Sequence, residues 1–219
     1  MDIKEKLKLI LLTIMITSSF IFGIAVTKIH YNCEPISNIV ELKDGKMGLD
    51  GEDLINQIKE VLKSNPKEII IRANSSGGRM VQGEIIYNYI NSIEIPVYSY
   101  IEDGCLSACY YGISSSDKIF AYNSSEVGNI GVTHPEPKSR FKVFAWSGKY
   151  KNTETEKEYI RKHLTSSAKL MHMDAVNKIK IGRRTKIKGT DEQLFEGLIW
   201  TGIEAKQFGL IDDIDSIHY

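Results

Sequence analysis

The sequence has no excess of charge of either sign, few cysteines and no internal repeat. Its 219 residues carry 28 Lys and Arg against 28 Asp and Glu, so the net charge is zero. Proteins that bind nucleic acid usually present an excess of positive charge, and nucleic acid is therefore not an expected partner. The three cysteines, Cys33, Cys105 and Cys109, are too few for a disulfide scaffold and lack the repeated spacing of a four-ligand zinc site. We expect no metal and no other cofactor.

Long hydrophobic runs are also absent, except near the N-terminus. Leu9 to Val26 contains no charged residue, whereas Lys4, Lys6 and Lys8 precede it. As a helix, about 18 residues span roughly 27 Å, close to the roughly 30 Å hydrocarbon core of a bilayer. Lysines before such a run favour a cytoplasmic N-terminus and export of the rest of the chain. The run therefore predicts a single-pass membrane protein whose main domain lies outside the cytoplasm.

These features divide the chain into four predicted parts. They are a cytoplasmic N-terminus at 1–8, a transmembrane anchor or uncleaved signal at 9–27, a tether at 28–35 and one domain at 36–219. Gly23-Ile24-Ala25 is a small-x-small pattern that a signal peptidase could accept. The apolar run is longer than a usual signal core, which favours an anchor that is not cleaved.

Beyond the tether, strand-like and helix-like segments alternate. Apolar, β-branched runs predict strands at 38–42, 68–73, 96–101, 118–122 and 129–132. Apolar residues at three- and four-residue steps predict helices at 51–63, at 80–90, from about 106 and from 159, with a loop at 102–104. Strands that alternate with helices indicate an α/β domain, in which functional groups collect at strand-to-helix turns.

Two such turns contain residues suited to chemistry. Asn74 to Gly78 (NSSGG) ends in paired glycines, which let a substrate approach bare backbone N–H groups. Ser107 lies among small residues at the predicted start of a helix, where a neighbouring N–H could hold an oxyanion. Taken alone, the first motif could equally be a tight loop and the second a helix-capping serine.

Three segments resemble, in the same order, motifs of the signal peptide peptidase A (SppA) family of membrane-bound serine peptidases. Asn74 to Gly78 is similar to that family's NSPGG. Ser107 to Ala121 (SACYYGISSSDKIFA), followed by Gly128 to Val132 (GNIGV), resembles SGGYYIASxADxIYA and GSIGV. Trp200 to Asp212 (WTGIEAKQFGLID) resembles WTGxxAxxxGLVD. The resemblance extends from about residue 38 to residue 214.

The resemblance implies an α/β fold of the Clp/crotonase type, a spiral of ββα units preceded by one N-terminal transmembrane helix. It implies a Ser-Lys dyad that hydrolyses peptides at a membrane, such as cleaved signal peptides, and assembly into a homo-oligomer. By position, Ser107 matches the nucleophile. The backbone N–H groups of Gly78 and Ala108, with Gly77 beside them, match the oxyanion hole.

The family's general base lies in a Ser-Gly-x-x-Lys segment, which stands here as Ser147 to Lys151. Lys151 therefore takes the catalytic position, and Lys149 is its near competitor. A desolvated lysine can lose its proton near neutral pH and serve a serine as base. His134 is an alternative base, because the related ClpP peptidases use a histidine about 25 residues after the serine.

The chain also departs from the family pattern. Ala108 and Cys109 replace two glycines after the serine, and Ser76 replaces a proline. Alanine keeps the backbone N–H, and we interpret Cys105 and Cys109 as small packing residues whose redox role stays open. Because of these departures, one alternative function that is not enzymatic stays open, namely a membrane-anchored peptide-binding module without peptidase activity.

Overall fold

The structure is a computed structural model that describes residues 37–46, 48–133 and 157–215. The chain divides into two units, at 1–37 and 38–219, and the strands and helices named here belong to the second. Its strands are β1 (Ile39–Gly45), β2 (Gly48–Leu49), β3 (Ile69–Ser75), β4 (Val97–Leu106), β5 (Lys118–Ala121), β6 (Glu126–Gly128), β7 (Ile199–Thr201) and β8 (Asp213–Ile214). Its helices are α2 (Gly51–Leu62), α3 (Met80–Asn91), α4 (Ala108–Ile113), α5 (Lys157–Arg183), η1 (Arg184–Lys186), α6 (Asp191–Leu194) and α7 (Gly202–Gln207).

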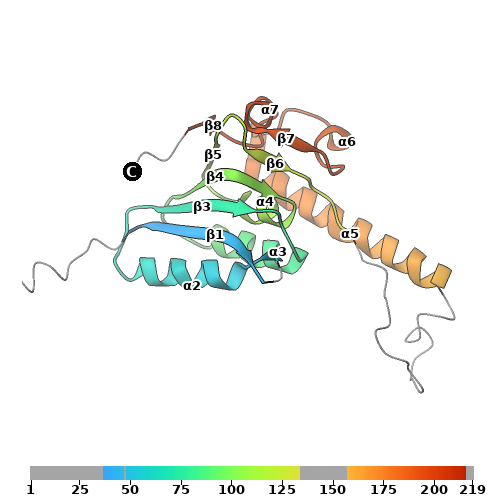
Figure 1. Cartoon of the computed structure of the whole chain (residues 1–219), viewed down its shortest axis with the longest axis horizontal. Coiled ribbons are helices and arrows are strands. Elements are labelled where there is room, and N and C mark those ends of the chain that lie inside the picture. The colour runs from blue at the N-terminus through green and yellow to red at the C-terminus, as the bar shows by residue number, and fades with distance from the viewer. Residues whose placement is uncertain (1–36, 47, 134–156, 216–219) are drawn as a thin grey trace, which may run out of the picture. The chain divides into compact units, whose positions relative to one another are not determined.

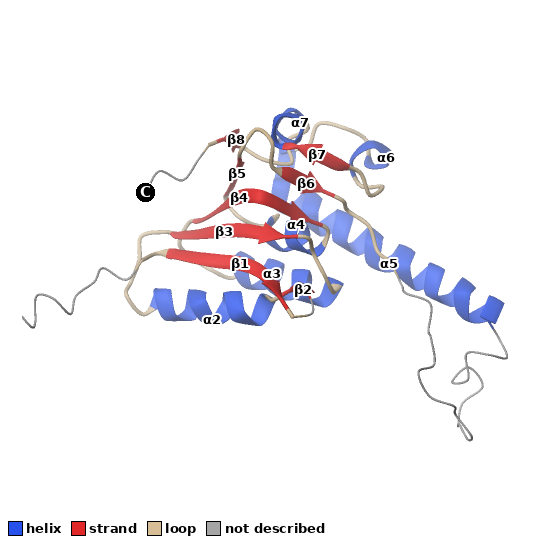
Figure 2. Ribbon diagram, in the orientation of Figure 1, coloured by secondary structure: helices blue, strands red, loops and turns tan. Residues whose placement is uncertain are grey.

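The strands form one mixed sheet in the order β2-β1-β3-β4-β5-β8. β1, β3, β4, β5 and β8 are parallel, whereas β2 is antiparallel to β1. Helices α2, α3 and α4 pack in succession beside the sheet, and the long α5 packs against α4 (Figures 1 and 2). The predicted mixed α/β class is therefore confirmed.

Most elements agree with the hydrophobic periodicity of the sequence. The alternating side chains of β3 are buried, and Leu54 and Ile58 bury one face of α2. Asp50 caps α2 by accepting a hydrogen bond from the backbone N–H of Asp53 at 3.1 Å. Apolar burial of this kind stabilises a fold by about 25 cal/mol per Å² removed from water.

The loop predicted at 102–104 is wrong, because β4 continues through it to Leu106. The first half of β4 pairs with β5, from Tyr98 opposite Lys118 to Ile101 opposite Ala121. The second half takes a new partner, since Gly104 to Leu106 pairs with β6. Polar residues interrupt the hydrophobic pattern here, but the backbone hydrogen bonds of β6 keep the chain extended.

The strand predicted at 129–132 is also wrong. Strand β6 ends at Gly128, whose carbonyl oxygen accepts a hydrogen bond from the Ser107 N–H at 2.8 Å. The Asn129 N–H donates instead to the Leu198 carbonyl oxygen at 2.7 Å. Beyond Gly128 the chain therefore leaves its pairing with β4.

The C-terminal segment holds α4 and α5 in place. The Tyr110 hydroxyl donates to the Leu210 carbonyl oxygen at 2.7 Å, and complete burial raises the pKa of this tyrosine. The Arg183 side chain is fully buried, and its guanidinium donates to the Asp212 carboxylate at 2.9 Å. Burial alone would raise the pKa of Asp212, but a hydrogen bond from Lys186 and the charge of Arg183 outweigh it, so this pKa is lowered.

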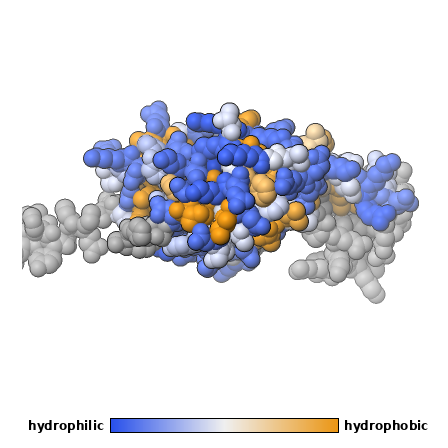
Figure 3. Space-filling view, turned by 90° about the horizontal axis from the view of Figure 1, so that it is seen from above, coloured by the Kyte–Doolittle hydropathy of each residue, from blue (hydrophilic) through white to orange (hydrophobic). Residues whose placement is uncertain are grey.

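Within the described ranges, no helix is both long and apolar enough to cross a bilayer. The apolar run at 9–26, on which the predicted anchor depends, lies outside those ranges. The face seen in Figure 3, from the side of α7 and β7, is mostly hydrophilic with smaller hydrophobic areas. Leu198, Ile199 and Ile203 are large apolar residues exposed on these two elements or beside them.

Candidate active site

Ser107 lies at the junction between β4 and α4 in a backbone conformation that non-glycine residues rarely adopt. Its φ is 53° and its ψ is −120°. Such a conformation costs about 1–3 kcal/mol and persists only where the surroundings enforce it. Hydrogen bonds hold it on both sides, because the Ser107 N–H donates to Gly128 and the Ser107 carbonyl oxygen accepts from the Tyr111 N–H at 3.0 Å.

The Ser107 hydroxyl has no hydrogen-bond partner among the residues that the structure describes. The side chain makes no capping hydrogen bond to α4, although Ser107 is the N-cap residue. The residue is half-buried at the wall of a cleft. A sharp strand-to-helix turn that presents an unengaged hydroxyl is the arrangement used by nucleophilic serines in other hydrolase folds. The geometry therefore favours a nucleophile over a capping serine.

The Gly77–Gly78 loop lies directly against Ser107. Gly77 has a φ of 99°, and a Cβ added to it would lie 2.7 Å from the Leu106 carbonyl oxygen and 2.9 Å from the Ser107 Cβ. Only glycine fits this approach without displacing the serine turn.

The loop also directs one N–H group. The Gly77 carbonyl oxygen accepts a hydrogen bond from the Leu49 N–H at 3.0 Å. A trans peptide places C=O and N–H on opposite sides, so the Gly78 N–H points away from Leu49. No hydrogen bond joins this N–H to another of the described residues, and Gly78 lines the same cleft as Ser107.

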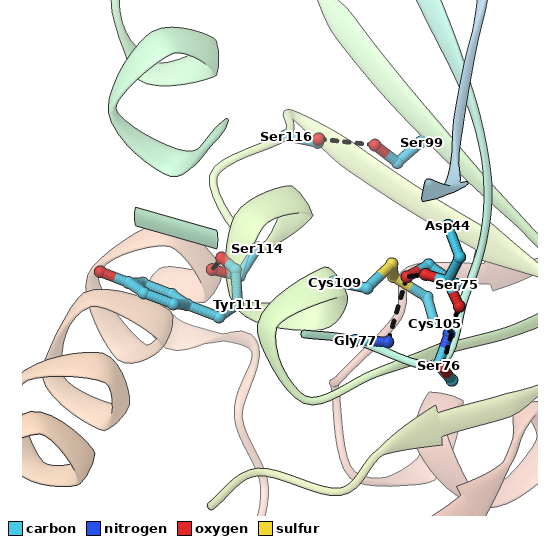
Figure 4. The surroundings of a disulfide bond; sticks show 10 residues. All are labelled: Asp44, Ser75, Ser76, Gly77, Ser99, Cys105, Cys109, Tyr111, Ser114 and Ser116. Carbon is cyan, nitrogen blue, oxygen red and sulfur yellow. Dashed lines mark hydrogen bonds between the residues drawn. A yellow bond between two sulfur atoms is a disulfide. The ribbon is translucent and has the colours of Figure 1, made fainter. Parts of the chain in front are cut away.

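Asp44, near the end of β1, anchors this loop. Its carboxylate accepts hydrogen bonds from the Ser75 hydroxyl and, at 2.8 Å, from the Ser76 hydroxyl. The Ser76 N–H donates to it at 3.2 Å, and the Gly77 N–H donates to the Ser75 hydroxyl oxygen at 3.0 Å. Figure 4 shows this chain of contacts from Asp44 to Gly77. Strands β1 and β3 thereby fix the loop at the edge of the cleft.

Ala108 begins α4, immediately after Ser107. The first N–H groups of a helix have no acceptor within the helix. Residue 108 is helical, so its alanine keeps that N–H without the strain that a positive φ would add. The structure thus brings together Ser107, Ala108, Gly77 and Gly78, four of the residues selected from the sequence.

The cleft beside Ser107 has a volume of about 650 Å³. Residues 129–133 line one part of it, and Lys169 and His172 of α5, with Glu196, line another. His172 also lines a smaller apolar pocket with Ser107, and its Nε2 lies 3.9 Å from a Glu196 carboxylate oxygen. The sequence-based prediction missed His172, although it shares a helix face with Ala168 and Ala175 at i+4 and i−3.

Cys105 and Cys109 form a disulfide, with their Cα atoms 5.2 Å apart. Both are completely buried, as expected of small packing residues, but the bond between them was not predicted from the sequence. β4 ends one residue after Cys105 and Cys109 is in the first turn of α4, so the chain reversal at Ser107 brings the two side chains together. Figure 4 shows the disulfide and its surroundings.

The three candidate bases, Lys151, Lys149 and His134, lie outside the described residues. The part of the chain at 37–46, 48–133 and 157–215 contains no group of three or more His, Cys, Asp or Glu placed to hold a metal ion.

Comparison with known proteins identifies the family. The model of "Peptidase family S49" matches residues 90–219. A putative signal peptide peptidase SppA of Enterococcus faecium is 26% identical over 183 residues, which are 74% of this chain and 52% of that protein. A chloroplastic serine protease SPPA of Arabidopsis thaliana is 27% identical over 185 residues, 76% of this chain and 27% of that protein.

A Na(+)/H(+) antiporter NhaA of Brucella abortus is 32% identical over 162 residues, 67% of this chain and 22% of that protein. Because the match covers only that share, the antiporter name is not carried over. The chain spans about half or less of the length of these three relatives. The family model matches more than half of the chain, and with the two named peptidases it confirms the predicted resemblance. The chain therefore belongs to peptidase family S49.

Proposed function

We propose that the chain is a membrane-anchored endopeptidase in which Ser107 is the nucleophile. The observation that carries this proposal is the Ser107 turn, which presents to the cleft beside Gly78 a hydroxyl that makes no hydrogen bond to another described residue. The hydroxyl would attack the scissile carbonyl while a base takes its proton. An acyl-enzyme would form as the amine leaves, and water would then release the second product.

The N–H groups of Gly78 and Ala108 are the proposed oxyanion hole. The Gly78 N–H is directed away from Leu49 and is not bonded to another described residue. The Ala108 N–H comes directly after the nucleophile, at the start of α4. Two donors preset in this way stabilise the negative charge that develops on the carbonyl oxygen, and removing one costs about 10²–10³ in kcat.

Lys151 is the proposed base, completing a Ser-Lys dyad. A lysine with its ordinary pKa of about 10.4 is protonated at neutral pH, so burial must lower that pKa before it can accept a proton. The apolar stretch Phe141 to Trp146 precedes it and could supply the cover. We expect Lys151→Ala to abolish turnover, and His134→Ala and Lys149→Ala to retain most of it. An inactive His134→Ala with an active Lys151→Ala would replace the dyad by a Ser-His arrangement.

The proposed substrates are peptides at the membrane, such as cleaved signal peptides. The uncharged run at 9–26 and the lysines before it support an anchor with an extracytoplasmic domain. A disulfide at Cys105–Cys109 also suits an oxidising compartment. The proposed parts are a cytoplasmic N-terminus at 1–8, an anchor at 9–27, a tether at 28–35 and the peptidase domain at 36–219. Protease digestion of intact cells tests the orientation, and shielding of residues 36–219 would overturn it.

We further propose a Clp/crotonase-like spiral and a homo-oligomer. The change of β4 from partner β5 to partner β6 supports the spiral, because it lets one strand belong to two successive layers. Sedimentation of the detergent-solubilised full chain tests the oligomer, and a monomer at micromolar concentration would contradict it.

A serine-reactive fluorophosphonate tests the proposed activity directly. The wild-type chain should become labelled at Ser107, and Ser107→Ala should not be labelled. The matched control is Ser124→Ala, an exposed loop serine outside the cleft, which should be labelled like the wild type. A folded wild-type chain that is not labelled but still binds peptide would instead be a binding module without peptidase activity.

A further inference from the structure

The disulfide brackets the proposed nucleophile. It joins the end of β4 to the first turn of α4 and closes a ring over only three intervening residues, of which Ser107 is the middle one. Both cysteines are completely buried. The bond therefore links the two elements whose junction sets the backbone conformation of Ser107.

The strand side of the ring also supports the Gly77–Gly78 loop. Cys105 lies opposite Ser75 in the pairing of β4 with β3, and opposite Val127 in the pairing with β6. Ser75 in turn accepts the hydrogen bond of the Gly77 N–H. Figure 4 shows the two cysteines with Ser75 and Gly77 around them. Cys105, at one end of the disulfide, is thus paired with the residue that supports the loop beside Ser107.

Reduction would remove the covalent link between β4 and α4. Bonded sulfur atoms lie about 2.05 Å apart, whereas atoms that are not bonded lie about 3.5–4 Å apart. Cys105, Ala108 and Cys109 have no exposed surface into which the sulfurs could separate. Close-packed interiors transmit such a change, so without the link the end of β4 and the start of α4 are no longer held in one arrangement. The Ser107 turn, which lies between them, would relax.

We propose that Cys105 and Cys109 are positioning residues whose disulfide holds Ser107 in its reactive conformation, so that the peptidase is active when oxidised and loses turnover when reduced. The proposal rests on the proposed role of Ser107 as nucleophile. Reduction by a dithiol transfers two electrons and two protons to the bond, giving two thiols and a cyclic disulfide. A low-molecular-weight disulfide reverses the exchange and is itself reduced to thiols.

The experiment uses the full chain in detergent with the substitution Cys33→Ser, so that Cys105 and Cys109 are its only cysteines. The protein is equilibrated with dithiothreitol or with oxidised glutathione, and alkylation followed by mass spectrometry counts its free thiols. A peptidyl phosphonate then labels the serine at a series of concentrations, which separates binding (KI) from bond formation (kinact). We expect kinact to fall at least tenfold on reduction, KI to stay within twofold, and reoxidation to restore kinact.

The double variant Cys105→Ala/Cys109→Ala is the matched control. It should label slowly under both conditions with an unchanged KI, while circular dichroism and thermal melting show a folded protein. Wild-type labelling rates in this variant, or in the fully reduced protein, would overturn the proposal. Global unfolding on reduction at the assay temperature would also overturn it, because the bond would then stabilise the whole domain rather than position one residue.

Ser107→Ala separates this proposal from the one on which it rests. If the oxidised Ser107→Ala chain is still labelled, Ser107 is not the nucleophile and the proposed function fails. If labelling depends on Ser107 but ignores the redox state, only the positioning role fails. If the buried disulfide resists reduction in the folded protein, the Cys105→Ala/Cys109→Ala variant provides the test. A wild-type kinact in that variant refutes the positioning role of the disulfide.

Discussion

Gly78→Ala should impair both the stability and the chemistry of the site. A Cβ added to Gly78 would lie 2.8 Å from the Leu49 backbone nitrogen and 3.3 Å from the Leu49 Cβ. Side-chain Cβ atoms do not approach a backbone nitrogen this closely, and Leu49 cannot turn aside as a flexible side-chain end could. The loop must therefore move away from β2. That movement breaks the hydrogen bond from the Leu49 N–H to the Gly77 carbonyl oxygen.

Two losses set the magnitudes. Overpacking of this kind costs about 1–3 kcal/mol of unfolding free energy. Rotation of the Gly77–Gly78 peptide removes one oxyanion donor, which lowers kcat about 10²–10³-fold. The positive φ belongs to Gly77 and not to Gly78. An alanine at position 78 therefore adds no left-handed backbone strain to this cost.

Two measurements check this prediction, urea unfolding for stability and the kinact of a peptidyl phosphonate for chemistry. Gly104→Ala is the matched control, because a Cβ there would meet only Glu126 atoms at an ordinary 3.4 Å. It should unfold and label like the wild type. A Gly78→Ala chain as stable as the wild type would refute the steric argument, and a folded one with unchanged kinact would remove this loop from the site.

Three further predictions concern the surroundings of the site. Asp44→Ala removes the acceptor that holds Ser75 and the loop, so kinact should fall about tenfold or more with KI little changed. Asp44→Asn should retain part of the rate. Equal kinact values in the wild type and both variants would contradict the role of Asp44 in anchoring the loop. Asp212→Asn leaves the buried Arg183 guanidinium without its anion and should cost about 3–5 kcal/mol in urea unfolding at neutral pH. Folding lowers the pKa of Asp212, so the stabilisation that its carboxylate provides is present above the unfolded-state pKa and is lost as pH falls through the folded-state pKa. The difference in unfolding free energy between the wild type and Asp212→Asn should therefore become smaller in acid, and a difference that does not change with pH would refute this. His172→Ala should widen the small pocket beside Ser107, raising kcat/KM for peptides with a large apolar residue at the cut relative to alanine, and an unchanged ratio would exclude His172 from specificity.

The sequence by itself determined the mixed α/β class, four of the eight described strands, the helices α2 to α5 and the family. Local periodicity is enough for β3 and α2, whose buried faces repeat at the spacing of a strand and of a helix. The motifs around Gly78 and Ser107 were recognisable because a close backbone approach demands glycine and a strand-to-helix turn demands small neighbours. These are short-range constraints, and a single chain displays them in order.

The tertiary structure alone decided where β4 ends and what surrounds Ser107. Strand β4 continues past Asp103 because β6, more than 20 residues later, supplies its hydrogen bonds. Cys105 and Cys109 meet because the chain reverses at Ser107, and His172 reaches the cleft because α5 packs against α4. The two cysteines are only four residues apart, but the turn that joins them is held by the hydrogen bond from the Ser107 N–H to Gly128. Each outcome thus involves a contact with a segment far along the chain, and no local pattern of hydrophobicity contains that information.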